Sequence, residues 1–249
     1  MKKRGLLSLV VPAYKQEKTI EEDIKRLSKF LPLLPLDYEI IVVVDGFEDK
    51  TFALAKRCEN KRIKVFGYKN NQGKGYAVKY GILKARGDLI GFIDAGGDID
   101  PSSIRILVDA FSKNTIDIAV GSKLHPQSNI NYPLIRKILS LGYRNISRVL
   151  FGFNVQDTQV GLKIFRKKVA RDIFKRVTIK KFAFDIEVLA IANSLGYRNI
   201  IESPVKLSLS GESSLNSKSF WKLVPRIFLD TLIVFYRLRL VRYYDRINH

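Results

Sequence analysis

Short apolar runs alternate with amphipathic stretches along the first half of the chain. Five runs are rich in Val, Ile and Leu and have the length of a buried strand: Leu7–Val11, Ile40–Val44, Ile63–Phe66, Leu89–Ile93 and Ile116–Val120. Between them the pattern predicts helices over 20–31, Thr51–Cys58, Tyr76–Ala85 and Ser102–Phe111. This β-α-β-α order predicts an α/β fold, with a mostly parallel sheet covered by helices on both faces.

The second half of the chain has a less regular pattern. It predicts helices over Leu134–Leu150 and Phe184–Leu195, and a strand over Ile200–Leu209. A polar loop, Ser210–Lys218, then precedes a long apolar-rich helical stretch, Trp221–Tyr244. We therefore expect one α/β domain over residues 1–218 and a helical segment over 219–249.

The helical segment at 219–249 has a broad apolar arc interrupted by charge. Arg226, Asp230 and Arg237 fall on one narrow stripe, and large apolar side chains fill most of the remaining surface. Such a pattern is typical of a helix that lies in a membrane interface, where arginines reach the headgroups. A core helix packed on the sheet, or a dimer interface, is the alternative. No run of 18 uncharged apolar residues occurs, so we predict no membrane span.

The chain is strongly basic, and the excess charge is uneven. The formal net charge is +20, and residues 123–181 contain 14 lysines and arginines against two acids, Asp157 and Asp172. This imbalance indicates an anionic partner: a nucleic acid, a phosphorylated substrate or an anionic membrane surface. The chain lacks helix-turn-helix, zinc and aromatic-strand RNA motifs, so we expect no nucleic-acid partner. Solubility alone is the remaining explanation of the charge.

Polar or special residues follow three of the predicted strands. They are Pro12–Tyr14, Asp45 and the acidic stretch Asp94–Asp98 of "GFIDAGGDIDP". Ligands gather outside the carboxyl ends of the strands in open α/β sheets, so these positions predict one site. Neither standard nucleotide motif fits, because "GYKNNQGKG" has five residues between its first two glycines and a glycine after Lys74. This spacing excludes a phosphate-loop ATPase site, and Val78, which stands where the third glycine belongs, excludes a standard dinucleotide site.

Seven motifs in order carry a more specific resemblance. They are "VVPAYKQE", "EIIVVVDGFEDKT", "NNQGKGYAVKYGILKARGD", "FIDAGGD", "VGSK", "DTQVGLKIF" and "FAFDIEVL". Together they resemble the family 2 inverting glycosyltransferases, most of all the dolichyl-phosphate glucosyltransferases and their polyprenyl-phosphate hexosyltransferase relatives. The resemblance covers roughly residues 8–247 and implies a nucleotide-sugar-binding fold of the GT-A kind.

The resemblance implies that the strand ends bind a nucleotide sugar. Pro12, Ala13 and Tyr14 would flank the base, and Asp45 would accept hydrogen bonds from it. Gln16 stands where the family often has glutamate. Lys74, ahead of a helix, would neutralise phosphate or contact the sugar, although a solvated loop lysine is as consistent with the sequence.

The family binds Mg²⁺ or Mn²⁺ through an Asp-x-Asp motif that this chain has only in part. The cation bridges the two phosphates of the donor, and a hard cation prefers oxygen ligands. Here the motif is Asp94-Ala95-Gly96, so the second aspartate is missing. The resemblance implies a metal site built from Asp94 and Asp98, with Asp94 and Ala95 also contacting the donor. A metal-free acidic turn is the alternative.

The basic stretch would bind the acceptor. Lys123 and Arg136 lie where relatives carry cations that bind the phosphate of the lipid. A phosphate oxygen is already anionic at neutral pH, which lowers the need for a general base. Asp157 and Asp185 are the catalytic candidates, to orient the acceptor or to balance developing charge. The alternatives are a turn residue at Asp157 and a helix N-terminal charge at Asp185.

These features predict an enzyme that transfers a hexose, with inversion, from a nucleotide sugar to polyprenyl or dolichyl phosphate. UDP-glucose is the favoured donor and GDP-mannose the second. We expect peripheral or monotopic association with the cytoplasmic face of an anionic membrane. Two alternatives stay open: a transferase that acts on a glycan or another lipid, and a pseudo-enzyme that binds nucleotide sugar without turnover.

Overall fold

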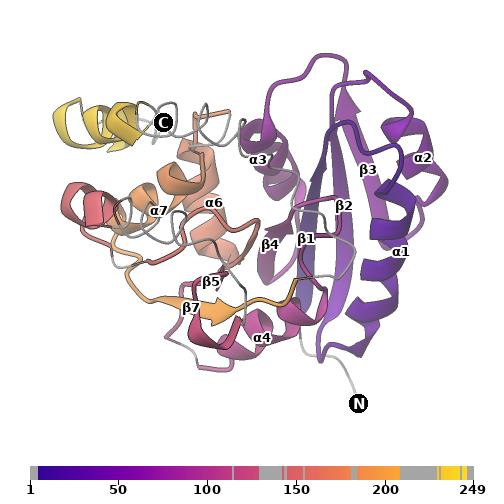
Figure 1. The fold of residues 1–249 in the computed structure, drawn as a ribbon, viewed down its shortest axis with the longest axis horizontal. Coiled ribbons are helices and arrows are strands. Elements are labelled where there is room, and N and C mark those ends of the chain that lie inside the picture. The colour runs from indigo at the N-terminus through magenta and orange to yellow at the C-terminus, as the bar shows by residue number, and fades with distance from the viewer. Residues whose placement is uncertain are drawn as a thin grey trace.

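The computed structural model describes residues 5–113, 115–128, 142, 145–153, 155–180, 184–207, 229, 231–241 and 243–245. Its centre is a seven-stranded sheet with helices on both faces (Figure 1). The strands are β1 (Leu6–Ala13), β2 (Asp37–Asp45), β3 (Ile63–Tyr68), β4 (Leu89–Ile93), β5 (Ile118–Ser122), β6 (Leu162–Arg166) and β7 (Ile200–Pro204). The longer helices are α1 (Ile20–Phe30), α2 (Thr51–Arg57), α3 (Lys74–Lys84), α4 (Ser102–Ala110), α6 (Lys167–Arg176) and α7 (Phe184–Ser194).

The order of the strands across the sheet is β3-β2-β1-β4-β6-β5-β7. β1, β2, β3 and β4 form parallel pairs with one another, and β5 pairs in parallel with β7. β6 is antiparallel to both of its neighbours, β4 and β5. The carboxyl ends of β1, β2, β4 and β5 and the start of β6 therefore meet at one edge of the sheet, where the candidate residues cluster.

Each face of the sheet is covered by its own apolar cluster. On one face, α1, α2 and α4 pack on side chains such as Leu9, Val42 and Val44. On the other face, α3, α6 and α7 pack on Val10, Val43 and Phe92. Residues that alternate along one strand thus face opposite clusters, and both sets are buried. This explains why the strands read as continuous apolar runs in the sequence.

The sequence predicted the first half of the fold closely and the second half less well. The five predicted strands of the first half are confirmed, with β5 shifted by two residues, and its four helices are confirmed. β6 and α6 had not been predicted, and β7 ends at Pro204 rather than at Leu209. The predicted helix at Leu134–Leu150 and the polar loop at Ser210–Lys218 lie mostly or wholly outside the described residues.

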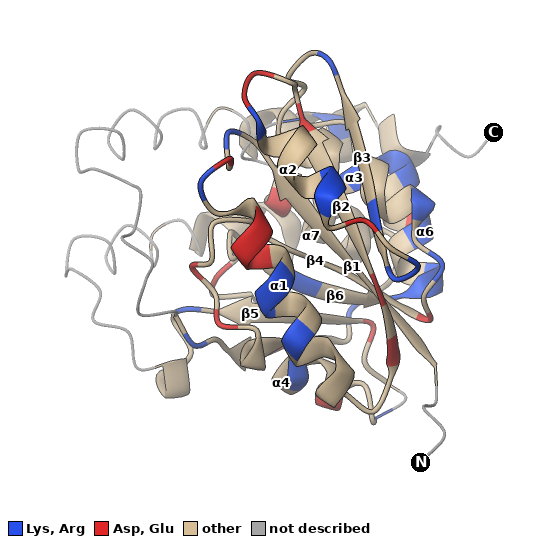
Figure 2. Cartoon of the chain, turned by 90° about the vertical axis from the view of Figure 1, so that its right-hand side faces the viewer, with Lys and Arg blue, Asp and Glu red and all other residues tan. Residues whose placement is uncertain are grey.

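Figure 2 shows lysines and arginines along α6, and several basic side chains in and beside this helix donate to backbone carbonyls. Arg171 donates hydrogen bonds to the carbonyls of Leu83 and Ala85 at the carboxyl end of α3. Arg166 donates to carbonyls beyond α4, and Arg176 donates to the carbonyl of Tyr244. The carboxyl end of a helix leaves carbonyls without partners, and Arg171 provides partners for two of them at the end of α3. Lys168 and Lys175 remain exposed on the same helix.

The described part of the C-terminal segment packs one side on the core. Val234 and Tyr244 are buried in the cluster that contains α7. The hydroxyl of Tyr244 donates a 2.7 Å hydrogen bond to Glu187, a fully buried carboxylate of α7. The predicted helical segment is therefore attached to the α/β domain, as the core alternative required. Among the described residues, no helix has the length and apolar character needed to cross a membrane.

Candidate functional site

Asp94 lies at the centre of the site, directly after β4. Its backbone N–H donates to the carbonyl of Gly161, just before the antiparallel strand β6. The carboxylate lies so close to Gly161 that a Cβ there would be 2.0 Å from Oδ2. Oδ1 of Asp94 is buried and has no hydrogen-bond partner among the described residues. The carboxylate thus presents one oxygen that a ligand atom would satisfy.

Lys74 takes the other oxygen of Asp94. Its Nζ donates a 2.7 Å hydrogen bond to Asp94 Oδ2 and lies 3.8 Å from Asp185 Oδ2. The rings of Phe92 and Phe184 lie within 6 Å of the same Nζ. Burial opposes the charge, but the carboxylates of Asp94 and Asp185 together raise the pKa of Lys74. The sequence left open a solvated loop lysine, and the structure instead shows an ion pair.

Asp185 is buried at the start of α7 and is paired from the other side by Lys163. Lys163 of β6 is fully buried and donates to Asp185 Oδ1 and to the carbonyl of Val160. Burial lowers the pKa of Lys163, and the carboxylate of Asp185 opposes that change. The helix-end interpretation of Asp185 is therefore incomplete, because its carboxylate joins two lysines from different elements.

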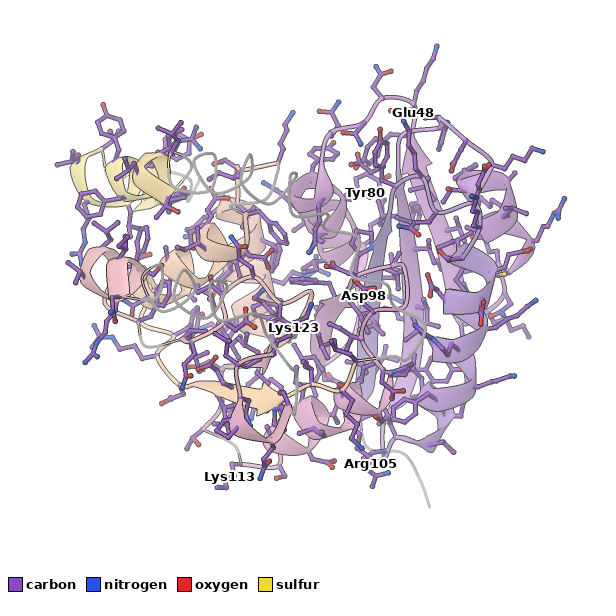
Figure 3. All side chains as sticks on the ribbon, viewed as in Figure 1. Glu48, Tyr80, Asp98, Arg105, Lys113 and Lys123 are labelled. Atoms are coloured by element: carbon purple, nitrogen blue, oxygen red, sulfur yellow. The ribbon has the colours of Figure 1, made fainter. Side chains whose placement is uncertain are left out.

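Asp98 lies beyond a glycine turn that α1 stabilises. Asp23 of α1 accepts a 2.8 Å hydrogen bond from the N–H of Gly96, and Arg26 donates to the carbonyl of Gly97. Both glycines have positive φ, 99° and 74°, which favours glycine. Burial and the nearby Asp94 charge raise the pKa of Asp98, whereas Lys123 lowers it. Figure 3 shows Asp98 and Lys123 near each other in the middle of the molecule.

The carboxylates of Asp94 and Asp98 provide part of the ligands that a hard cation needs. Asp98 lies near enough to Asp94 for the charge of Asp94 to raise its pKa, and Asp94 has an oxygen without a partner among the described residues. Oxygen ligands of this kind suit Mg²⁺ or Mn²⁺. No group of three or more potential ligands occurs in the part of the chain that the structure describes. Water or phosphate oxygens would have to complete the coordination.

Asp45, at the end of β2, already has two backbone partners. Its Oδ1 and Oδ2 accept hydrogen bonds of 2.7 and 2.8 Å from the N–H groups of Gln72 and Gly73. The side chain of Asn71 also donates to the carbonyl of Asp45. Asp45 therefore fixes the loop that places Lys74. Any contact with a base would use the remaining lone pairs of the same carboxylate.

The residues after β1 are divided between core and rim. Pro12 and Ala13 are buried in β1, whereas Tyr14 is 40% exposed and donates a hydrogen bond to Glu48. Gln16 lies beside Gly96, because a Cβ on that glycine would be 3.7 Å from Gln16 Nε2. Tyr14 and Gln16 are thus the two side chains of this group that lie at the rim of the candidate site.

Asp157 and Lys123, the residues predicted to lie near the acceptor, are close neighbours. Asp157 Oδ2 accepts a 2.9 Å hydrogen bond from the N–H of Lys123. Surrounding protein atoms raise the pKa of Asp157 above its ordinary value, and the charge of Lys123 counteracts part of that change. Arg136, the other predicted acceptor contact, lies outside the described residues.

With this geometry in place, comparison with known proteins identifies the family. The model of glycosyl transferase family 2 matches residues 8–174, more than half of the chain. The chain belongs to glycosyl transferase family 2. The matched range contains Asp94, Asp98, Asp157 and Lys163, and it ends before Asp185.

Several curated relatives of the chain are dolichyl-phosphate beta-glucosyltransferases. The one from Dictyostelium discoideum is 32% identical over 204 residues, which cover 76% of this chain and 62% of the relative. One from Trichomonas vaginalis is 31% identical over 243 residues, 92% of this chain and 71% of the relative. The chain thus spans less than two thirds of the length of the Dictyostelium protein.

Solved structures confirm the expected GT-A fold. Glucosyl-3-phosphoglycerate synthase from Mycobacterium tuberculosis, crystallised with Mn²⁺, UDP and glucosyl-3-phosphoglycerate, gives a TM-score of 0.67 at 18% identity. The match covers 92% of this chain and 80% of that one. Mannosyl-3-phosphoglycerate synthase from Rubrobacter xylanophilus gives 0.69 at 16% identity and covers 94% and 74%. At this identity the similarity shows the shared fold.

Sequence reasoning missed three residues that shape the site of this family 2 member. Lys163 interrupts the apolar run of "LKIF", and a lysine inside such a run signals a buried ionic partner. Asp23 lies between Ile20 and Ile24 on the apolar side of α1, which again signals a specific bond. Gly161 gave no signal, because its role depends on β6 lying antiparallel to β4.

Proposed function

We propose that this family 2 member transfers a hexose, with inversion, from a nucleotide sugar to polyprenyl or dolichyl phosphate. The observation that carries the proposal is the similarity to dolichyl-phosphate beta-glucosyltransferases over 92% of the chain at 31% identity. The site supports it independently, because carboxylates and lysines from four elements converge at the strand ends. Such an arrangement suits a diphosphate and a second phosphate.

On the donor side, Asp94 and Lys74 would bind the diphosphate of the nucleotide sugar. Lys74 would move a charge-assisted hydrogen bond from Asp94 to a phosphate oxygen. Tyr14 and Gln16 at the rim, with Asp45 behind the loop, would contact the base and ribose. UDP is the favoured nucleotide, because the solved structures that share the fold include complexes with UDP.

A divalent cation would bind at Asp94 and Asp98. Bound Mg²⁺ or Mn²⁺ supplies positive charge that offsets the charge developing on the leaving diphosphate. The fold is shared with enzymes crystallised with Mn²⁺ or Mg²⁺. The unpartnered Oδ1 of Asp94 is the feature of this chain that agrees with such a ligand.

On the acceptor side, Lys123 and Arg136 would bind the phosphate of the lipid. Asp157, whose backbone partner is Lys123, would orient that phosphate. Asp185 would act through the two lysines that it pairs with. An anionic phosphate oxygen would attack the anomeric carbon, and the nucleoside diphosphate would leave with the electrons of the broken bond.

We further propose that an apolar surface on two neighbouring helices contacts the membrane. This apolar surface consists of exposed side chains near the C-terminus and on the helix at 145–151: Ile146, Val149, Leu229, Leu232, Ile233, Tyr236, Leu240 and Tyr243. The ring centroids of Phe151 and Phe235 lie 6.4 Å apart, so the two helices are in contact, and they lie one above the other at the left of Figure 1. Exposed apolar side chains among arginines are typical of interfacial helices. The cytoplasmic face is the side that we propose.

Two other functions remain as second candidates. A glycan or another lipid would serve as acceptor if the apolar surface does not bind membranes. The missing second aspartate at Gly96 favours a pseudo-enzyme that binds nucleotide sugar without turnover. An assay that measures release of nucleoside diphosphate in the presence of several acceptors distinguishes each of these functions from transfer to polyprenyl phosphate.

A donor screen tests the proposed function. The full chain is incubated in detergent with UDP-glucose or GDP-mannose, with and without polyprenyl phosphate, and released nucleoside diphosphate is measured. We expect release from one donor that depends on polyprenyl phosphate and is lost in Asp94→Asn. Release that needs a glycan instead would support the first alternative, and nucleotide binding without release would support the pseudo-enzyme.

A further inference from the structure

One oxygen of Asp94 is already bound by a cationic side chain of the protein. The chain has one aspartate where the family motif has two, and Lys74 donates to Oδ2 of that aspartate at 2.7 Å, beside the unpartnered Oδ1. The pair is accessible from the site, because the Lys74 and Asp94 side chains are 26% and 38% exposed. An ammonium at this distance provides the positive charge that a metal ion would otherwise bring.

The surroundings of Lys74 keep its Nζ on Asp94. The alternative carboxylate, Asp185, lies 3.8 Å away and is already paired with the buried Lys163. The rings of Phe92 and Phe184 contact the ammonium from the other directions. Asp45 fixes the preceding backbone through Gln72 and Gly73. Asp94 is therefore the strongest single partner available to Lys74 when no ligand is bound.

We propose that Lys74 competes with the divalent cation for Asp94, so that the metal binds this site only together with a nucleoside diphosphate. The inference rests on the proposed function, because it assigns the order of ligand binding at the same donor site. It concerns the lysine of this chain rather than the existence of the metal site.

The physical reason is charge repulsion that the diphosphate relieves. An ammonium and a divalent cation on one carboxylate repel each other strongly at separations of about 4 Å. A diphosphate adds at least two negative charges and offers oxygens to both cations. Lys74 then has a better partner than Asp94, and the carboxylate becomes free to bind the metal.

Binding of Mn²⁺ to the full chain, followed by electron paramagnetic resonance of the free ion, tests this proposal without any turnover. The titration is done on the wild type, Lys74→Met and Lys74→Gln, each alone and with UDP or GDP. Lys69→Met is the matched control, because Lys69 is an exposed lysine five residues away. Asp94→Asn shows which part of the binding belongs to the site, and thermal melts confirm that each variant is folded.

We expect weak Mn²⁺ binding to the wild type alone and tighter binding when nucleotide is present. Both Lys74 variants should bind Mn²⁺ alone at least about tenfold more tightly than the wild type, whereas Lys69→Met should not. Unchanged Mn²⁺ affinity in folded Lys74 variants would overturn the competition and leave the proposed function standing. Tight Mn²⁺ binding to the wild type alone would overturn it as well.

A different result would count against the site itself. If neither nucleotide promotes Mn²⁺ binding in the wild type, and the Lys74 variants bind no Mn²⁺, both the inference and the proposed donor site are wrong.

Discussion

At the scale of single residues, the candidate site consists of aspartates at strand ends and of their partners from other elements. Asp45, Asp94 and Asp98 were predicted because aspartates after apolar runs mark strand ends, and parallel strands bring those ends together, whereas Asp157 was a candidate only through the family resemblance. Their partners were not predictable in the same way. Lys163 reaches Asp185 across 22 positions of sequence, and that contact depends on how β6 and α7 pack. Ion pairs between distant elements follow from the fold, so the sequence can show that a partner is needed without identifying it.

Gly161 provides a test of the position of Asp94. In Gly161→Ala, the new Cβ would lie 2.0 Å from Asp94 Oδ2 and displace the carboxylate. We expect donor-dependent turnover to fall by at least about tenfold, since misplacement by about 1 Å can cost a hundredfold. Nucleotide-dependent Mn²⁺ binding should fall with it.

Gly142→Ala is the control for this change, because a Cβ at that exposed helical glycine meets nothing within 4 Å. Normal turnover in folded Gly161→Ala would show that the carboxylate of Asp94 has no fixed position in catalysis.

Asp157 predicts a pH effect on stability. Its pKa is raised above the ordinary 3.8, mainly by burial, so the folded state retains the proton to higher pH than the unfolded chain. Stability that this group contributes is therefore present at low pH and is lost as the pH rises through the raised pKa. We expect Asp157→Asn to increase the melting temperature at pH 7, with a smaller increase near pH 4.

Thermal melts between pH 4 and pH 7 measure this difference, and Asp109→Asn on the exposed side of α4 serves as the control. A gain that is equal at both ends of the range would mean that ionisation of Asp157 costs the fold nothing.

At the scale of helices and strands, elements that pair with distant partners were harder to predict from the sequence than continuous apolar strands. Continuous apolar runs identified β1 to β5, because strands buried on both faces leave that pattern. β6 was missed because Lys163 interrupts its five residues and the strand pairs antiparallel with partners far along the chain. α6 was missed because six of its ten residues are charged. The apolar side of α6 becomes apparent only when it packs on β6.

The contact between α6 and α3 predicts a stability effect of Arg171. Its guanidinium donates to two carbonyls at the carboxyl end of α3, so Arg171→Ala would leave both without this partner. We expect a loss of about 1.5–3 kcal/mol in the free energy of unfolding, measured by denaturant titration. Lys168→Ala, on the exposed side of α6, should change it by less than about 0.5 kcal/mol. Equal losses in the two variants would mean that the two carbonyls gain no more from Arg171 than they would from water.

At the scale of the whole molecule, the C-terminal segment has two different sides. Val234 and Tyr244 are buried against the domain, whereas Leu232 and Leu240 are 41% and 69% exposed. The sequence left open an interfacial or a core helix because its apolar arc is too broad for one side. Among the described residues, the inward side agrees with the core alternative, and the exposed side is free for a membrane surface. The candidate donor site and the exposed apolar surface are therefore parts of one molecule.

Changes on the exposed side of the C-terminal segment should affect membrane binding, and changes on its buried side should affect stability. Leu232→Ser with Leu240→Ser should reduce co-sedimentation with anionic vesicles at least about tenfold and leave the thermal melt nearly unchanged, because these side chains are exposed. Val234→Ser should lower the melting temperature, because that side chain is fully buried. Vesicle binding that survives the double change would place the membrane contact on another surface.

If the protein transfers a hexose to polyprenyl phosphate, the covalent structure of the lipid product will show it. The full chain is incubated with UDP-glucose, polyprenyl phosphate and Mn²⁺ in detergent, and the isolated lipid is analysed by mass spectrometry and by NMR of the anomeric proton. We predict one hexose on the lipid phosphate with the β configuration, which is inverted relative to the α-linked donor, and no product with Asp94→Asn. A lipid that stays unmodified with both UDP-glucose and GDP-mannose, under conditions where the protein binds nucleotide, would contradict the account.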